Sequence, residues 1–137
     1  MANEAGMLTK FSDLEYFGIT AATAFTKGTV MVLASEATSS NMQVRAHAAA
    51  NEFFAGVVAA DNIADEANGN ITLRTRGRFK FIAGGTIAPG NAVTLGATAN
   101  QVVAANIATL SYTDYGKIIG IALTNATSGN EVIVWRG

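Results

Sequence analysis

Polar and apolar positions alternate most regularly within residues 71–95. Basic side chains occupy every second position of its first half, at Arg74, Arg76, Arg78 and Lys80. The positions between them hold Thr75, Gly77, Phe79 and Phe81. Strict alternation is typical of a β-strand, so the pattern predicts a single strand with a basic face and an opposite face carrying both rings.

A turn is predicted directly after this strand. Ala83-Gly84-Gly85 ends the alternation, and Ala88-Pro89-Gly90-Asn91 follows. Proline supplies φ near −65° at the second turn position and glycine supplies a positive φ at the third, as a type II turn requires. Since the next apolar run opens at Ala92, we predict a hairpin-like unit of two strands joined by this turn.

The other apolar runs are short and are separated by Gly- and Asn-rich turns, which favours further strands. They cover residues 29–34, 42–46, 53–60, 101–104, 117–123 and 131–135. The Ala-rich residues 47–51 leave a short helix open. Because Gly is common and strong helix formers are few, we predict an all-β fold.

Several of these features recur at a near-constant spacing. Gly28 and Gly90 each precede a strand, Gly56 and Gly120 each interrupt one, and these equivalent positions lie 62 and 64 residues apart. The pattern indicates two pseudo-repeats, at about 17–76 and 77–137, each of roughly four strands. One such unit would be marginal alone, so we expect a single β domain over 17–137, a small compact β-barrel or sandwich with one shared core. Chance similarity between Gly-rich strands is the alternative.

Residues 1–16 lie outside the repeats and are predicted to form an extended N-terminal arm. Their apolar residues stand among charged ones without turn signals: Met7, Leu8, Phe11 and Leu14. Two interpretations are open, a frayed terminus or a segment that becomes ordered on a partner.

Composition narrows the possible functions. Half of the 137 residues are apolar, 14% are charged, and the net charge is −1. The low charge favours self-association, and nothing in it points to nucleic acid or membrane as a partner. Without cysteine, disulfides and thiol chemistry are excluded. No signal peptide and no spanning segment are evident, so we expect synthesis in a cytoplasm.

Candidate chemistry is sparse. His47 is the only histidine, so a His-based zinc site or catalytic triad has no support, and we expect a surface or loop residue. Asp61, Asp65 and Glu66 lack the spacing of an EF-hand. Gly84-Gly85 lacks the lysine of a phosphate loop. We therefore predict no enzyme activity, catalytic residue, metal, cofactor or small-molecule substrate.

The basic face of the 74–80 strand has three interpretations. It could bind nucleic acid, although Phe79 and Phe81 lie on the other face. A surface that binds single strands needs its basic and its aromatic side chains on the same face. It could be a docking or inter-subunit face that meets Asp61, Asp65 and Glu66 of a neighbour. It could also be an ordinary solvated face.

Six short segments, most of them with a glycine beside apolar residues, form a recognisable series: residues 56–61, 70–73, 76–79, 87–93, 118–122 and 131–134. These segments resemble the trimeric head decoration, or cement, proteins of tailed bacteriophages and a related family of small capsid cement proteins. The resemblance implies a β-tulip-like fold and homotrimers on the outer surface of the virion capsid. The trimers would bind the major capsid protein, with Met7, Leu8, Phe11 and Leu14 of the arm as anchors, and would bridge capsomers and stabilise the shell against DNA pressure.

The resemblance implies no catalysis and no membrane partner, while the basic run is denser than expected of the family. Two alternatives stay open. A nucleic-acid-binding β-barrel using residues 74–80 would show a steep salt dependence of its affinity for single strands. A small β-barrel hydrolase would need a pocket with strongly shifted carboxylates.

Overall fold

The computed structural model describes residues 14–19, 24–34, 43–59 and 70–137. These residues form strands and two short 3-10 helices, with no α-helix among them, which confirms the predicted all-β class. The strands are β1 Leu14–Ile19, β2 Val30–Leu33, β3 Gln43–Ala46, β4 Phe54–Val58, β5 Asn70–Arg74, β6 Gly77–Ala83, β7 Ala92–Leu95, β8 Gln101–Ala104, β9 Gly120–Ala122 and β10 Glu131–Arg136. The 3-10 helices are η2 Ile107–Thr109 and η3 Tyr112–Lys117.

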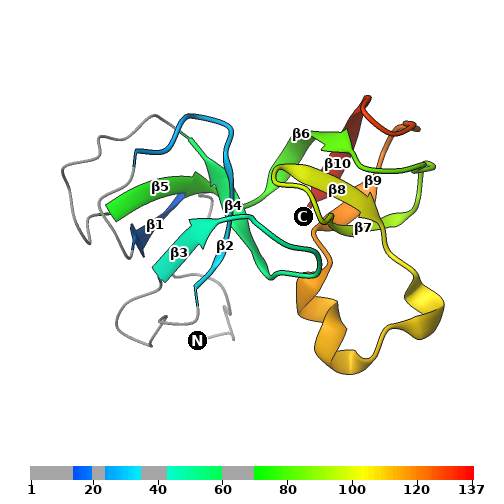
Figure 1. Cartoon of the computed structure of the whole chain (residues 1–137), viewed down its shortest axis with the longest axis horizontal. Helices are drawn as coiled ribbons and strands as arrows, with labels where there is room; N and C mark the ends of the chain where they lie inside the picture. The colour runs from blue at the N-terminus through cyan, green and yellow to red at the C-terminus, as the bar shows by residue number, and fades with distance from the viewer. Residues whose placement is uncertain (1–13, 20–23, 35–42, 60–69) are drawn as a thin grey trace, which may run out of the picture.

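The strands close into two five-stranded barrels that stand side by side (Figure 1). The strand order is β1-β3-β2-β4-β5 in the first barrel and β6-β8-β7-β9-β10 in the second. Every pairing in one has its counterpart in the other, including the parallel pairs β1/β3 and β6/β8. The two predicted repeats are therefore present, but each has five strands rather than four and closes a barrel of its own.

Matching glycines allow both barrels to close tightly. Gly56 in β4 lies opposite Met31, and Gly120 in β9 lies opposite Val93. A Cβ on Gly56 would stand 2.7 Å from the carbonyl oxygen of Arg74, and one on Gly120 would overlap the carbonyl oxygen of Trp135. Each glycine thus lets its strand approach the last strand of its barrel.

Two cores replace the single shared core that the sequence suggested. The smaller fills the first barrel with Met31, Val44, Ala55, Val58, Ile71 and Leu73. The larger fills the second barrel and extends to residues on the outer face of β2 and β4. Val57 and Ile121, which each follow one of the matching glycines, do not meet in a shared core: Val57 is half-buried between the barrels and Ile121 is 46% exposed. Their neighbours Val58 and Ala122 point inward instead, because successive strand residues face opposite sides.

An aromatic cluster joins the barrels. Phe54 from β4 meets Phe79 and Phe81 of β6 edge-on, with ring centroids 5.9 and 6.1 Å apart. Val30 and Val32 of β2 are buried in the same cluster. The outer face of β2 and β4 is therefore the first barrel's side of the interface, in agreement with their central position in Figure 1.

The alternating stretch is two strands rather than one. β5 ends at Arg74 in the first barrel, and β6 begins at Gly77, with φ +120°, in the second. Thr75 and Arg76 connect the barrels. The hairpin-like unit is also wrong, because β6 pairs with β8 and β10 and not with β7. The type II turn itself is confirmed: Gly90 has φ +89°, and Asn91 N–H donates to the Ala88 carbonyl oxygen over 3.1 Å.

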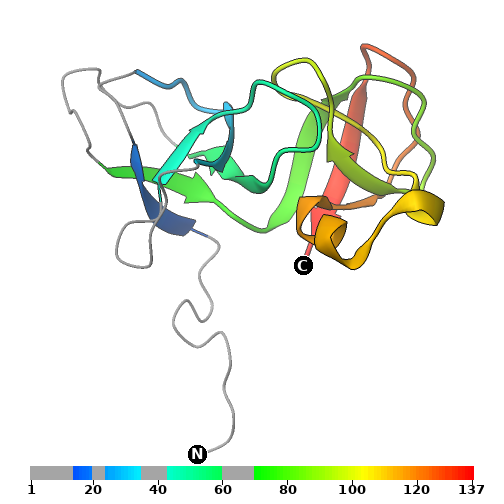
Figure 2. The same ribbon diagram turned by 60° about the horizontal axis from the view of Figure 1, so that its bottom comes forward.

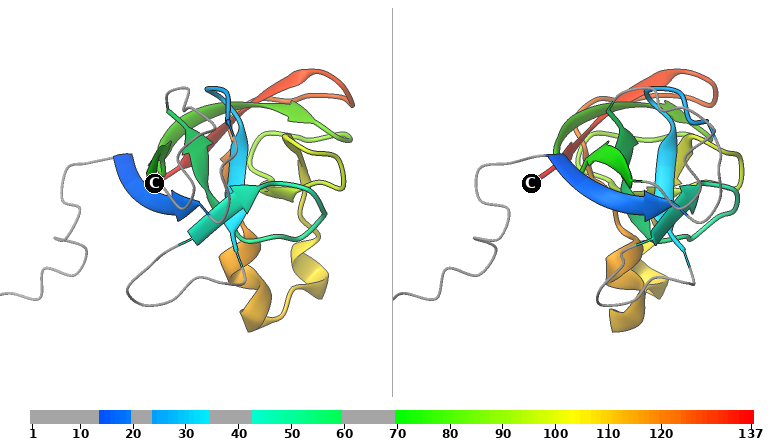
Figure 3. Two further views of the ribbon diagram at one scale, coloured as in Figure 1. Left: turned by 60° about the vertical axis from the view of Figure 1, so that its left-hand side comes forward. Right: turned by 90° about the vertical axis from the view of Figure 1, so that its left-hand side faces the viewer.

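The first strand shortens the predicted arm. β1 starts at Leu14, whose backbone lies opposite Arg74 of β5, so Leu14 belongs to the barrel and not to an arm ending at residue 16. Figure 3 (right) views the molecule with the first barrel toward the reader and the second barrel behind it, and β1 (blue) crosses the front of the first barrel. Met7, Leu8 and Phe11 lie outside the described residues. Residues 47–51 form a turn and no helix.

Candidate functional site

The outer face of β9, β10 and β6 in the second barrel carries an exposed row of large side chains. Trp135 in the middle strand lies directly opposite Arg78 on one side and Ile121 on the other. Trp135 is 50% exposed. Leu123, just beyond β9, is also exposed, and its N–H donates to the carbonyl oxygen of Ile133 on β10. We call Ile121, Leu123 and Trp135, with Arg78 beside them, the tryptophan face.

The four basic residues, for which a docking face was one of three interpretations, divide between the two barrels. Arg74 ends β5, Arg76 lies in the connection, and Arg78 and Lys80 project from β6. All four side chains are exposed, so the basic residues do share the solvent-facing side, as the alternation in the sequence indicated. Phe79 and Phe81 are 8% and 4% exposed and pack between the barrels. Neither ring of this strand is therefore available to stack on a nucleic-acid base.

The charges on this face differ in their partners. Lys80 Nζ lies 3.2 Å from Glu131 Oε2, and both side chains are well exposed, so this ion pair contributes little stability. Among the residues that the structure describes, Arg76 and Arg78 have no carboxylate at ion-pair distance. These two guanidinium groups can therefore pair with an acidic partner from outside this part of the chain.

Sequence reasoning did not single out Trp135. It was placed only at the end of the last strand, although the period of two from exposed Glu131 puts Ile133 and Trp135 on the same outward face. The outward position of Trp135 could therefore have been read from the sequence. The residues beside Trp135 on β6 and β9 could not, because the pairing of β10 with these strands is long-range.

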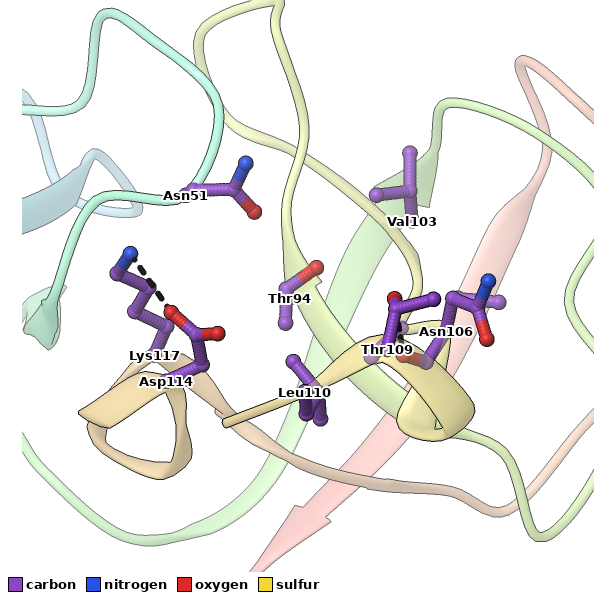
Figure 4. Close-up of a pocket in the computed structure, with 10 residues that line it drawn as sticks. Asn51, Thr94, Val103, Asn106, Thr109, Leu110, Asp114 and Lys117 are labelled. Atoms are coloured by element: carbon purple, nitrogen blue, oxygen red, sulfur yellow. Dashed lines mark hydrogen bonds and ion pairs between the residues drawn. The ribbon is translucent and has the colours of Figure 1, made fainter. Parts of the chain in front are cut away.

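A polar pocket of about 290 Å³ lies beside the junction of the barrels (Figure 4). Asn51 contributes from the turn between β3 and β4, and Thr94 contributes from β7. The remaining wall comes from residues 103–117, whose η2 and η3 project from the second barrel (Figure 2). Asn51 has φ +61°, and its N–H donates to the Leu95 carbonyl oxygen over 3.3 Å.

The charged groups of this pocket are already engaged with each other. Asp114 Oδ1 accepts from Lys117 Nζ over 3.1 Å, and Oδ2 accepts from the N–H and hydroxyl of Ser111. The backbone N–H of Ser111 and then Lys117 hold the pKa of Asp114 below its usual value. An ionised carboxylate held in this way stabilises the start and end of η3. No group of three or more His, Asp or Glu side chains in the described segments could hold a metal ion.

His47 lies in the loop between β3 and β4, one of the two positions expected from the sequence, but it is buried there and is not on the surface. It is 3% exposed and lies at the barrel junction. Its Nδ1 accepts the N–H of Asn100 over 3.0 Å, so the ring proton is on Nε2, which lies 2.8 Å from the Gly96 carbonyl oxygen. Asn100 Oδ1 in turn accepts the N–H of Val30 over 2.8 Å. The Ala-rich sequence around His47 gave no sign that this turn is covered by the second barrel.

Arg136 ties the end of the second barrel to the connection between the barrels. Its Nε donates to the Thr75 carbonyl oxygen and its Nη1 to that of Ile119, both over 2.8 Å. The guanidinium carbon lies 5.1 Å from the centroid of the Phe54 ring. Burial lowers the pKa of Arg136 from its usual value.

The described part of the chain contains no helix long and apolar enough to cross a membrane. No protein-family model matches the sequence, and no curated protein matches it. Among solved structures, the chain is similar to the N base of the head fiber gp8.5 of bacteriophage phi29, with a TM-score of 0.56 and 18% identity. The match covers 90% of this chain and 94% of that one. At this identity the likeness establishes a shared fold.

Proposed function

We propose that this chain is a structural protein of a tailed-phage head, which binds the outer surface of the capsid as a homotrimer and stabilises the shell. One observation carries the proposal: the two-barrel fold is shared over nearly its whole length with the base of a phage head fiber. The short segments that resemble capsid cement proteins support the same role, and no observation favours a nucleic-acid-binding function.

Binding surfaces, rather than a reaction centre, are what this role requires. The exposed indole of Trp135 and the unpaired guanidinium of Arg78 form a surface of the composition found in protein interfaces. The arm, now limited to residues 1–13, adds Met7, Leu8 and Phe11 as apolar anchors for the major capsid protein. A trimer brings three such arms to one site, so modest contacts combine into slow dissociation.

The proposed role does not involve catalysis. Asp114, the carboxylate that lines the pocket, is engaged by Ser111 and Lys117. A general base or nucleophile needs a free, suitably placed group. We infer that the protein is made in the host cytoplasm and is carried on the exterior of the virion, where it bridges neighbouring capsomers.

Co-sedimentation with head shells tests this function. Shells of the phage that encodes the protein, assembled without it, are mixed with increasing amounts of the purified chain. We expect saturable binding at a stoichiometry that is a multiple of three per site, and decorated shells that retain DNA at higher temperature than bare shells. Single-stranded DNA is the control ligand. An absence of shell binding at saturating concentrations, or tighter binding to the DNA, would overturn the proposal.

A further inference from the structure

The tryptophan face has an apolar centre and a basic border. It continues along β10 to Ile133, which is half-buried and lies opposite Lys80 on β6. β9 and β10 therefore supply the aliphatic and aromatic side chains, whereas β6 supplies Arg78 and Lys80 along one side. The three large side chains at the centre are each 45–50% exposed. A contiguous exposed apolar strip with a polar rim marks an interaction surface.

The indole ring of Trp135 extends along β10 toward the last residue of the strand's run. A Cβ on Gly137 would stand 3.3 Å from Cζ2 and 3.4 Å from Cη2 of this ring. Because Arg136 lies opposite Gly77, the same end of β10 is the end at which Arg76 leads into β6. An aromatic ring and an arginine thus occupy the same end of the face, and these two residue types dominate binding energy in protein interfaces.

The first barrel shows what covers the equivalent face in this fold. Val57 is the counterpart of Ile121, because Val57 lies opposite Val30 as Ile121 lies opposite Ala92. Val57 is half-buried and packs against the core cluster of the second barrel. Ile121 stays 46% exposed. The position that packs against protein in the first barrel is therefore open to a protein partner in the second.

The basic border specifies an acidic partner. Arg76 and Arg78 are exposed and have no carboxylate at ion-pair distance among the described side chains. The side chain of Glu15 lies outside those described. Each of the three described acidic side chains already has a basic partner: Glu52 with Arg45, Asp114 with Lys117, and Glu131 with Lys80. Since this set in a second copy holds no unpaired carboxylate, charge complementarity favours a different protein.

We propose that the tryptophan face docks on the shell protein of the head, at a surface that presents carboxylates around an apolar side chain. The inference rests on the proposed function and names the part of the folded body that makes the contact. Trp135, Ile121 and Leu123 supply the apolar centre, and Arg76 and Arg78 pair with the carboxylates. Strand pairing in a closed barrel fixes the backbone of the centre before binding, which limits the entropy lost on association.

Trp135 is the only tryptophan of the chain, so the face can be observed directly. Biosynthetic replacement by 7-azatryptophan gives a fluorophore that is excited separately from the tryptophans of the shell. We expect the emission of a solvent-exposed ring from the chain alone at every concentration, and a shift to shorter wavelength when shells that lack the protein are added. A shift as the chain alone is concentrated would assign the face to a second copy. That result, or a shift with single-stranded DNA, would overturn the proposal.

Co-sedimentation of variants with the same shells tests the apolar centre. Trp135→Ser should raise the dissociation constant about tenfold or more, because that is the effect of losing an interface hot spot. Ile107→Ser is the matched control, since Ile107 is 68% exposed and lies outside the face, and it should bind like the unmodified chain. Far-UV circular dichroism and thermal unfolding establish that each variant is folded.

Two measurements test the charged border. Arg78→Glu should weaken binding and reduce its dependence on salt, whereas Lys27→Glu, in the turn before β2, is the control and should not. Conversion of the shell's carboxylates to amides with carbodiimide and ethanolamine should weaken binding of the unmodified chain. Binding that is insensitive to Trp135→Ser or to this treatment would overturn the inference and leave the proposed function intact. An unmodified chain that does not bind shells would overturn both.

Discussion

Asn100 in the second barrel donates its backbone N–H to Nδ1 of His47 in the first barrel over 3.0 Å. The bond is paired with a second one, since Asn100 Oδ1 accepts from Val30 N–H in the first barrel over 2.8 Å. His47 is buried, so these bonds are sheltered from competing water. The junction of the barrels therefore has a directional polar component beside the contacts of Phe54 with Phe79 and Phe81.

The first prediction concerns this hydrogen bond. His47→Phe keeps an aromatic ring but leaves the Asn100 N–H without an acceptor, which should lower the free energy of unfolding by about 1–3 kcal/mol. His47→Asn is the matched control, because its side-chain oxygen places an acceptor near the position of Nδ1 and should recover part of the loss. Urea unfolding measures both. Equal stabilities for the two variants would show that the acceptor does not matter.

The second prediction concerns acid stability. Burial opposes ionisation of Glu52, but the N–H groups of Ala48 and Ala49 and the guanidinium of Arg45 outweigh it and hold the pKa of Glu52 below its usual value. A lowered pKa in the folded state means that the carboxylate stabilises the protein above its unfolded-state pKa and loses this effect as the pH falls through the folded-state value.

Glu52→Gln should therefore reduce the free energy of unfolding by about 1–3 kcal/mol at neutral pH, from the lost charged hydrogen bonds. The difference from the unmodified protein should shrink as the pH falls from about 7 to about 3. Chemical unfolding at a series of pH values measures it. A difference that stays constant with pH would contradict the role assigned to the carboxylate.

The third prediction concerns the turn before β7. Gly90→Ala places a Cβ on a residue with φ +89°, and no other atom lies within 4 Å of that Cβ, so the cost comes from the backbone alone. We expect a loss of about 1–2 kcal/mol. Gly85→Ala is the control, because its Cβ also meets open space and its φ is not in the left-handed region. Equal melting temperatures for the two variants would argue against the strained turn.

The fourth prediction concerns closure of the second barrel. Gly120→Ala drives a Cβ into the carbonyl oxygen of Trp135, which belongs to a ladder strand and cannot move freely. The loss should exceed that of Gly90→Ala, at about 2–4 kcal/mol. Thermal unfolding of both variants provides the comparison. The reverse order of stabilities would mean that β9 is not held close to β10.

The fifth prediction separates the arm from the first strand. A variant lacking residues 1–13 keeps β1 and should unfold like the full chain while losing its binding to head shells. A variant that starts at Phe17 also loses Leu14–Tyr16, which pair with Arg74, Leu73 and Thr72 of β5, and should have a lower melting temperature. If the shorter deletion binds shells as well as the full chain, attachment does not depend on the arm.

The strand pattern was readable from the sequence because it is local. Alternating burial through Phe79 and Phe81 and the turn at Gly90 follow from residues close in the chain, and the matching Gly56 and Gly120 follow from the repeat in the sequence. Whether the two repeats share one barrel or close two is decided by the long-range pairing of the strands. The connection between the barrels at Thr75-Arg76 could not be seen in the sequence, because polar and apolar residues alternate through it without interruption. The site depended on the same information. Arg78 was found as part of the basic run, whereas its neighbour Trp135 is 57 residues away in the chain.

Each barrel is closed by pairing its first strand with its last, β1 with β5 and β6 with β10. On the ribosome, the first barrel can therefore be completed soon after Arg74 leaves the exit tunnel, whereas the second must wait for Arg136. During that interval Val30, Val32 and Phe54 face solvent, because the rings of Phe79 and Phe81 are not yet in place to cover them. The rate at which the second half is translated thus sets how long the nascent chain exposes a surface that promotes aggregation.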